Sequence, residues 1–186
     1  MVALETPRVD LGWQAADFTL PGIDGKTHSL KELAGERGTV VAFICNHCPY
    51  IKAITDRLVA AADEMREFGV ALIAINPNDA ESYPEDSFEN MKRFAAERGF
   101  GFPYLCDESQ EVARTYDAVC TPDFFGFDKD LKLRYRGRLD IGRKEPPPEG
   151  APNDLVNAMG QIADHGHGPA EQFPSMGCSI KWKAED

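Results

Sequence analysis

The stretch Val40-Val41-Ala42-Phe43-Ile44-Cys45-Asn46-His47-Cys48-Pro49-Tyr50 decides the fold. Its first half is a continuous apolar run rich in β-branched residues, which is typical of a central strand buried on both faces of a sheet. A helix is expected to follow, because apolar residues then recur every three or four positions as far as Phe68. Pro49 suits the first turn of that helix, where a missing N–H is tolerated. Two cysteines, Cys45 and Cys48, therefore lie at a strand-to-helix junction.

The spacing of these two cysteines predicts a redox-active dithiol. Cys45 is expected at the helix N-terminus, where free N–H groups and the helix dipole favour a thiolate. Cys48 lies three residues further on, on the same helix face, and can close a small disulfide ring with Cys45. We therefore expect an exposed nucleophile at Cys45 and a shielded resolving thiol at Cys48. His47 is expected to tune Cys45 through positive charge, with an ordinary surface residue as the alternative.

The rest of the chain predicts an α/β fold, with a sheet covered by helices on both faces. An N-terminal hairpin is expected around the Asp24-Gly25 turn. Further strands are expected over 70–75, 102–106, 124–127 and 131–135, and further helices over 85–98, 107–116 and 153–163. We expect a single domain over residues 1–186, with a core of about 12–163 and a C-terminal tail over 164–186.

The composition and net charge of the chain disfavour several classes of function. The chain has 186 residues and a net charge of -11, which disfavours a sequence-independent nucleic-acid surface. No targeting segment and no apolar run of membrane-spanning length is evident, so neither nucleic acid nor a membrane is expected as a partner. The expected compartment is the cytoplasm, where thiols are kept reduced. Of five cysteines only Cys45 and Cys48 have a redox spacing, so structural disulfides are not expected.

Three motifs taken together identify a family. They are Ala16-Asp17-Phe18-Thr19-Leu20-Pro21 with Asp24-Gly25-Lys26, then Cys45-Asn46-His47-Cys48-Pro49, and finally Thr121-Pro122-Asp123-Phe124-Phe125. In their order and spacing the chain resembles the peroxiredoxin-like members of the alkyl hydroperoxide reductase/thiol-specific antioxidant (AhpC/TSA) family. The resemblance runs from about residue 12 to residue 182.

The resemblance implies a thioredoxin-like fold with a central mixed sheet flanked by helices, an N-terminal β-hairpin and a C-terminal tail. It further implies that Pro122 is a cis-proline facing the C-x-x-C. The backbone groups of Thr121 would then pair with a bound disulfide or peptide, which makes Thr121 and Pro122 the expected substrate-binding residues.

The chain departs from true peroxiredoxins in their Pro-x-x-x-Thr-x-x-Cys motif. Aligned on Cys48, the proline position holds Val41 and the threonine position holds Cys45. The hydroxyl that would position a peroxide is therefore missing. This departure favours a thioredoxin-type dithiol over hydroperoxide chemistry.

Other thiols have two interpretations each. Cys120 lies two residues before Pro122 and is either a small buried hydrophobe or an additional redox thiol. Cys178, in the ending Gly177-Cys178-Ser179-Ile180-Lys181-Trp182-Lys183, is either a third thiol or an anchor for the tail, and we favour the anchor. A C-x-x-C is also half of a metal site, which would need His165, His167 or Cys178 from a tail folded back over it.

These observations predict a thiol-disulfide oxidoreductase built on the Cys45-Asn46-His47-Cys48 dithiol. Its substrate would be a protein or small-molecule disulfide, and an external thiol reductant would supply electrons. No metal and no cofactor is expected. Two alternatives stay open, namely a peroxiredoxin-like thiol peroxidase that reduces hydroperoxides, and a non-catalytic thiol protein that binds metal or a partner.

Overall fold

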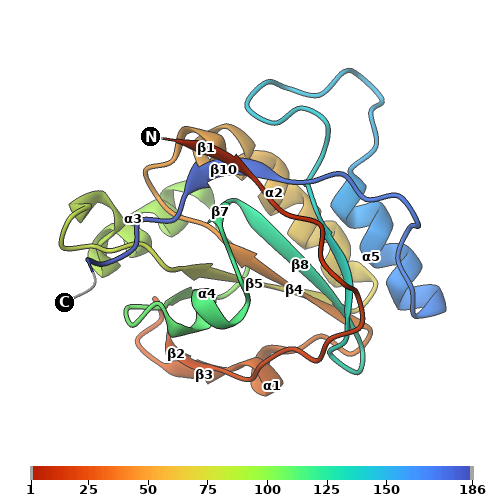
Figure 1. Ribbon diagram of the computed structural model, residues 1–186, viewed down its shortest axis with the longest axis horizontal. Helices are drawn as coiled ribbons and strands as arrows, with labels where there is room; N and C mark the ends of the chain where they lie inside the picture. The colour runs from red at the N-terminus through yellow and green to blue at the C-terminus, as the bar shows by residue number, and fades with distance from the viewer. Residues whose placement is uncertain (1, 185–186) are drawn as a thin grey trace.

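A five-stranded mixed sheet forms the centre of the computed structural model, which describes residues 2–184 (Figure 1). The predicted apolar run is its middle strand, β4 (Gly38–Phe43), and every residue of this strand is buried. Strand β5 runs parallel to β4 on one side, and β8 runs antiparallel to it on the other. The order across the sheet is β6-β5-β4-β8-β9. The other four strands are β5 (Val70–Asn76), β6 (Tyr104–Cys106), β8 (Asp123–Asp128) and β9 (Leu133–Gly137).

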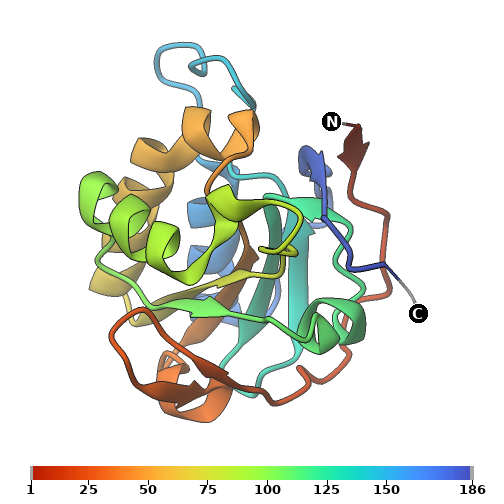
Figure 2. The ribbon, with the colours of Figure 1, turned by 90° about the vertical axis from the view of Figure 1, so that its left-hand side faces the viewer.

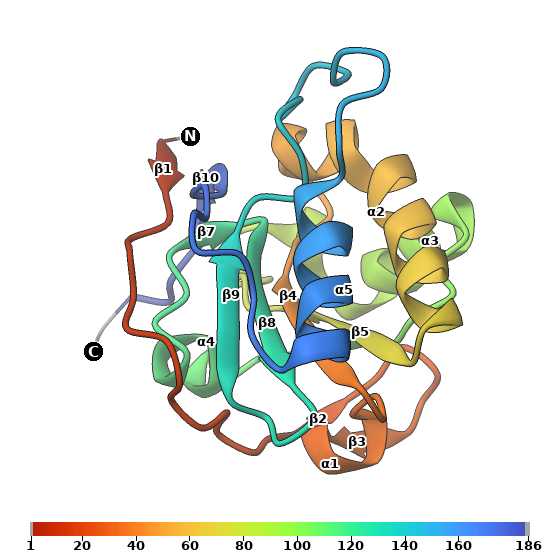
Figure 3. The ribbon, with the colours of Figure 1, turned by 90° about the vertical axis from the view of Figure 1, so that its right-hand side faces the viewer.

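Helices cover both faces of this sheet, as the pattern of elements predicts. Three helices pack on one face, and Figure 3 shows two of them, α2 and α5, side by side against the strands. Those three are α2 (Pro49–Glu67), α3 (Phe88–Arg98) and α5 (Asp154–His165). A short 3-10 turn, η1 (Pro84–Asp86), precedes α3. The opposite face is covered by α4 (Glu111–Thr115) and the N-terminal hairpin (Figure 2).

The predicted N-terminal hairpin is present. Strand β2 (Thr19–Pro21) pairs antiparallel with β3 (Thr27–Ser29), and Gly25 in the turn has the positive φ of +80° that glycine tolerates. The hairpin leads into the single turn of α1 (Leu30–Leu33), which begins with a capping box between Ser29 and Glu32. This layer covers the apolar face of the central sheet that lies opposite helices α2, α3 and α5.

The C-terminal tail forms a second sheet that the sequence analysis did not predict. Strand β10 (Met176–Ser179) lies between β1 (Ala3–Glu5) and β7 (Cys120–Thr121), antiparallel to both (Figure 1). Cys178 is thereby placed opposite Thr121. A Cβ at Gly177 would stand 2.1 Å from the carbonyl oxygen of Thr121, so only glycine lets the two strands approach so closely.

The tail beyond β10 is fixed by hydrogen bonds to distant loops. The Lys181 N–H donates to Asn78, and the Lys181 carbonyl accepts from Gln110, both within 2.9 Å. Arg114 stacks on the ring of Trp182 at 4.6 Å. The residues after Cys178 are thus held against the loops that carry Asn78 and Gln110. No helix within residues 2–184 has the length and apolarity needed to cross a membrane.

Candidate active site

Cys48, rather than Cys45, lies at the N-terminus of helix α2. The helix begins at Pro49, and Cys48 is its N-cap residue with extended backbone dihedrals. Cys45 lies three residues earlier, in the segment that leaves β4. The prediction that Cys45 sits at the helix N-terminus is therefore wrong, because the first helical residue is Pro49 and the residue before it is Cys48.

Neither cysteine is exposed, so the expected contrast between an open Cys45 and a shielded Cys48 is also wrong. Both side chains have 0% relative exposure. The cover over Cys48 includes β10, which brings the Sγ of Cys178 to 2.8 Å from the Sγ of Cys48. This separation is that of a hydrogen-bonded pair of thiols and is longer than a disulfide bond of about 2.05 Å. The five cysteines are nevertheless all free thiols in this structure.

Cys48 is the one cysteine of this site whose pKa is lowered. A hydrogen bond from the Cys45 thiol is the largest cause that lowers the pKa of Cys48, to about 5, and a hydrogen bond from the Cys178 thiol adds to it against the opposing effect of burial. The N-terminal end of α2 also favours negative charge at its N-cap residue. A low-pKa cysteine at a helix N-terminus is typical of reactive thiols.

Cys45 is kept as a neutral thiol. Burial raises its pKa well above the ordinary value, and the hydrogen bond to Cys48 raises it further. Its Sγ lies 3.1 Å from the Oγ1 of Thr121, and either group can donate the hydrogen bond between them. The hydrogen bond between the two thiols therefore raises the pKa of Cys45 and lowers that of Cys48, which is the opposite order to the one predicted from the sequence.

His47 is oriented by a buried carboxylate, Asp86. The Nδ1 of His47 lies 2.6 Å from the Oδ2 of Asp86, and this hydrogen bond raises the pKa of His47 although burial opposes the rise. The charge of Cys48 also raises the pKa of His47, so imidazolium and thiolate stabilise each other. The ring further stacks on Tyr83, with centroids 5.5 Å apart. The predicted tuning by His47 is therefore directed at Cys48 rather than at Cys45.

Asp86 is the residue of this site that the sequence analysis missed. Its carboxylate also accepts hydrogen bonds from the backbone N–H of Asn46 and from the side chain of Asn78, each at 2.7 Å. These bonds and His47 hold its pKa below the usual value in spite of burial. Asp86 belongs to η1, some 40 residues after the dithiol in sequence, and nothing in its local pattern distinguishes it from a surface carboxylate.

Thr121 lies against both cysteines of the dithiol. The Thr121–Pro122 peptide bond is cis, which confirms that part of the resemblance. The Thr121 carbonyl lies 3.4 Å from the Sγ of Cys48. The backbone edge that Thr121 was expected to offer to a substrate is, however, already paired with Cys178 of the same chain.

The remaining thiols lack the features of Cys48. Burial raises the pKa of Cys120 strongly and that of Cys106 to about 11. Cys120 points its Sγ at the carbonyl of Pro122, 3.4 Å away, and is buried, as expected for a small hydrophobe. Within residues 2–184, the cluster of three metal-capable side chains is formed by Cys45, His47 and Asp86, and neither His165 nor His167 belongs to it.

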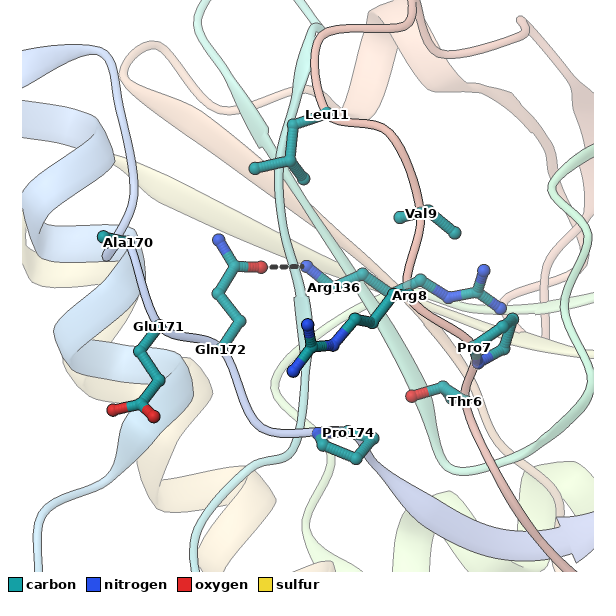
Figure 4. A pocket seen from close by; sticks show the side chains of 10 residues that line it. All are labelled: Thr6, Pro7, Arg8, Val9, Leu11, Arg136, Ala170, Glu171, Gln172 and Pro174. Carbon is teal, nitrogen blue, oxygen red and sulfur yellow. Dashed lines mark hydrogen bonds between the residues drawn. The ribbon is translucent and has the colours of Figure 1, made fainter.

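A separate pocket lies away from the dithiol. It has a volume of about 280 Å³ and is bordered by the segment around Arg8 and by Gln172, whose Oε1 accepts a hydrogen bond from the backbone N–H of Arg136 (Figure 4). Arg136 itself forms a buried ion pair with Asp123, with its Nη2 at 2.8 Å from Oδ2. None of the five cysteines lines this pocket, so it does not form part of the thiol site.

Several known proteins are similar to this chain in sequence or in structure. A crystal structure of an uncharacterized conserved protein from Geobacillus kaustophilus is 48% identical, with a TM-score of 0.92 and coverage of 100% of this chain and 99% of that chain. Thiol-disulfide oxidoreductase ResA from Halalkalibacterium halodurans is 30% identical over 56% of this chain and 55% of its own length, so this chain matches little more than half of that relative.

Two further findings establish fold and family. The thioredoxin domain of a thiol-disulfide oxidoreductase from Bacteroides vulgatus shares the fold at 17% identity, with a TM-score of 0.64 over 84% of this chain and 99% of that chain. This likeness confirms the predicted thioredoxin-like fold. The AhpC/TSA family model matches residues 11–136, which contain all three motifs. The chain therefore belongs to the AhpC/TSA family, as its motifs predicted.

Proposed function

We propose that this protein is a thiol-disulfide oxidoreductase in which Cys48 attacks a substrate disulfide. The observation that carries the proposal is the position of Cys48, an N-cap thiol with its pKa lowered to about 5 by hydrogen bonds from two neighbouring thiols. Such a thiol is largely ionised at neutral pH, and the thiolate is the species that attacks disulfides. The ResA relative, named as a thiol-disulfide oxidoreductase, supports this class of reaction.

The reaction has two exchange steps. The Cys48 thiolate attacks one sulfur of the substrate disulfide, which forms a mixed disulfide and releases the other sulfur as a thiolate that takes up a proton. The Cys45 thiol then loses its proton and attacks the Sγ of Cys48, which releases the second substrate thiol. The product is a Cys45–Cys48 disulfide, and an external dithiol reductant returns it to the reduced state.

Substrate access requires a local opening of the small sheet. Cys48 is buried under β10, and β10 pairs with β7 at two positions, Cys178 with Thr121 and Ser179 with Cys120. One hydrogen bond flanks this pairing on each side, from the Ser175 hydroxyl to the Pro122 carbonyl and from the Ile180 N–H to the Val119 carbonyl. Backbone hydrogen bonds contribute about 0.5–1.5 kcal/mol each, so parting such a short pair costs little compared with global unfolding. Once β10 has moved, the backbone of Thr121 is free to pair with a disulfide-containing peptide.

A hydroperoxide is the second candidate substrate, and one observation favours it. Cys48, followed by Pro49 at the start of α2, occupies the position that the peroxidatic cysteine has in the family motif. The threonine of that motif is replaced by Cys45, but the Oγ1 of Thr121 stands 3.1 Å from the Cys45 thiol. A hydroxyl is therefore present close to the site, although from another strand.

Activity on the two substrate classes distinguishes the proposals. Reduction of insulin disulfides and of hydrogen peroxide is measured side by side with one dithiol reductant, for the wild-type protein and the Cys48→Ser and Cys120→Ala variants. We expect disulfide reduction that Cys48→Ser abolishes and Cys120→Ala leaves intact. Turnover of peroxide alone would favour the peroxidase, and metal retained after mild purification without turnover would favour the metal-binding alternative.

A further inference from the structure

We infer that Cys178 is a third redox thiol, which resolves the mixed disulfide on Cys48 by forming a Cys48–Cys178 disulfide. This inference rests on the proposed function and adds a second internal partner for the nucleophile. Its first support is distance, because the two Sγ atoms are 2.8 Å apart. Two side chains 130 residues apart in sequence thus already lie close to bonding distance.

The second support is that the backbone is built to hold Cys178 there. Strand β10 pairs with β7 in a register that sets Cys178 opposite Thr121, the residue beside the cis-proline. Gly177 makes this approach feasible, since any Cβ there would collide with the Thr121 carbonyl at 2.1 Å. The hydroxyl of Ser175 donates to the carbonyl of Pro122 at 2.8 Å and fixes the entry to the strand.

The third support is that β10 occupies the place expected for a substrate backbone. The chain thus presents a cysteine of its own to Cys48 on the edge where a disulfide-containing peptide is expected to bind. Cys178 is also 4% exposed, so it is protected from reagents in bulk solvent and available chiefly to Cys48.

The chemistry balances without any further reactant. Burial is the largest cause that raises the pKa of Cys178 to about 12, and the charge of Cys48 raises it further. This charge is lost once Cys48 has attacked a disulfide. Cys178 then loses its proton and attacks the Sγ of Cys48, and the second substrate thiol leaves with a proton. Two protein thiols are oxidised to one disulfide, and one substrate disulfide is reduced to two thiols.

The test removes Cys45, so that Cys178 is the remaining neighbour. The reduced variants Cys45→Ser, Cys45→Ser/Cys178→Ser and Cys45→Ser/Cys120→Ala are treated with oxidised glutathione, quenched in acid and analysed by intact and peptide mass spectrometry. We expect the first and third to end with a bond between the Cys48 and Cys178 peptides. The second is expected to stop as a glutathione adduct on Cys48. An adduct that accumulates equally in the first and second variants would overturn the inference, as would a Cys48–Cys120 bond.

A glycine substitution tests the geometry while keeping every native thiol except Cys45. Gly177→Ala in the Cys45→Ser background pushes β10 away from Thr121, and a displacement of about 1 Å can slow an aligned reaction by about 10²-fold. We expect the mixed disulfide on Cys48 to persist about 10- to 100-fold longer. Gly160→Ala is the matched control, because a Cβ there meets no atom within 4 Å. Equal lifetimes in both glycine variants would overturn the inference.

The two proposals fail in different ways. If the wild-type protein reduces no disulfide catalytically, yet Cys45→Ser still forms the Cys48–Cys178 bond, the proposed function fails and the inference stands. If Cys178→Ser reduces insulin as fast as the wild type and Cys45→Ser forms no such bond, the inference fails and the proposed function stands.

Discussion

Replacing Cys45 by alanine should raise the pKa of Cys48 by about one to two units. The hydrogen bond from Cys45 is the largest of the influences that lower the pKa of Cys48 from 9.0 to about 5. A hydrogen bond to a charged group is worth about 1.5–3 kcal/mol, and one pKa unit corresponds to about 1.36 kcal/mol. Cys45→Ser should raise the pKa less, because its hydroxyl still donates to the thiolate although it cannot form a disulfide.

The titration is followed by the ultraviolet absorbance of the thiolate, which does not require a reagent to reach the buried sulfur. The curve of Cys45→Ala/Cys48→Ala is subtracted from that of Cys45→Ala. Burial raises the pKa of the other thiols, to about 12 for Cys178, so they titrate well above Cys48. If Cys48 titrated at the same pH in the wild type and in Cys45→Ala, the assignment of Cys45 as the donor that activates Cys48 would be wrong.

Three further outcomes follow from the buried charges. Asp86→Asn should lower the pKa of His47, measured by NMR of the imidazole, because the charged hydrogen-bond acceptor is lost. The wild type should become more stable relative to Cys48→Ser as the pH rises from 5 to 9, by up to about 1.4 kcal/mol of unfolding free energy per pH unit. The reason is that the lowered pKa of Cys48 lets the native state bind fewer protons than the unfolded state in this range, and the extra stability is lost as the pH falls through 5. A stability difference that does not change with pH would contradict this prediction. Asp123→Ala should lower the free energy of unfolding in urea by about 3–5 kcal/mol, because it leaves the buried guanidinium of Arg136 without its charged partner. A loss below about 1 kcal/mol would argue against an ionic pair.

Much of the sheet could be predicted from the sequence because its central elements have strong periodicity. The apolar run that became β4 and the three-four spacing that became α2 are each determined by burial over several residues. The cis-proline was predicted from a family motif and not from local chemistry. By contrast, β1 and β10 are three and four residues long and exist only through pairing with each other and with β7.

The details of the site depended on facts that a local pattern does not contain. The helix begins at Pro49, so its N-cap residue is Cys48 and not Cys45. Asp86 reaches His47 from another loop, through a tertiary contact without periodicity. The same holds for Cys178, whose neighbour Cys48 is 130 residues away. The place of Cys45 and Cys48 between a buried strand and a helix was predicted from the sequence, but the pKa of each thiol depends on tertiary contacts.

The most direct test of the central claim locates the mixed disulfide with a protein substrate. Three variants, each retaining one thiol of Cys45, Cys48 and Cys178 and serine at the other two positions, are incubated with insulin and analysed by mass spectrometry. The account predicts that a covalent complex accumulates with the variant that retains Cys48, and at least about tenfold less with the other two, since Cys48 has a lowered pKa and the other two thiols have raised ones. A complex that forms chiefly through Cys45, or in none of the three, would contradict it.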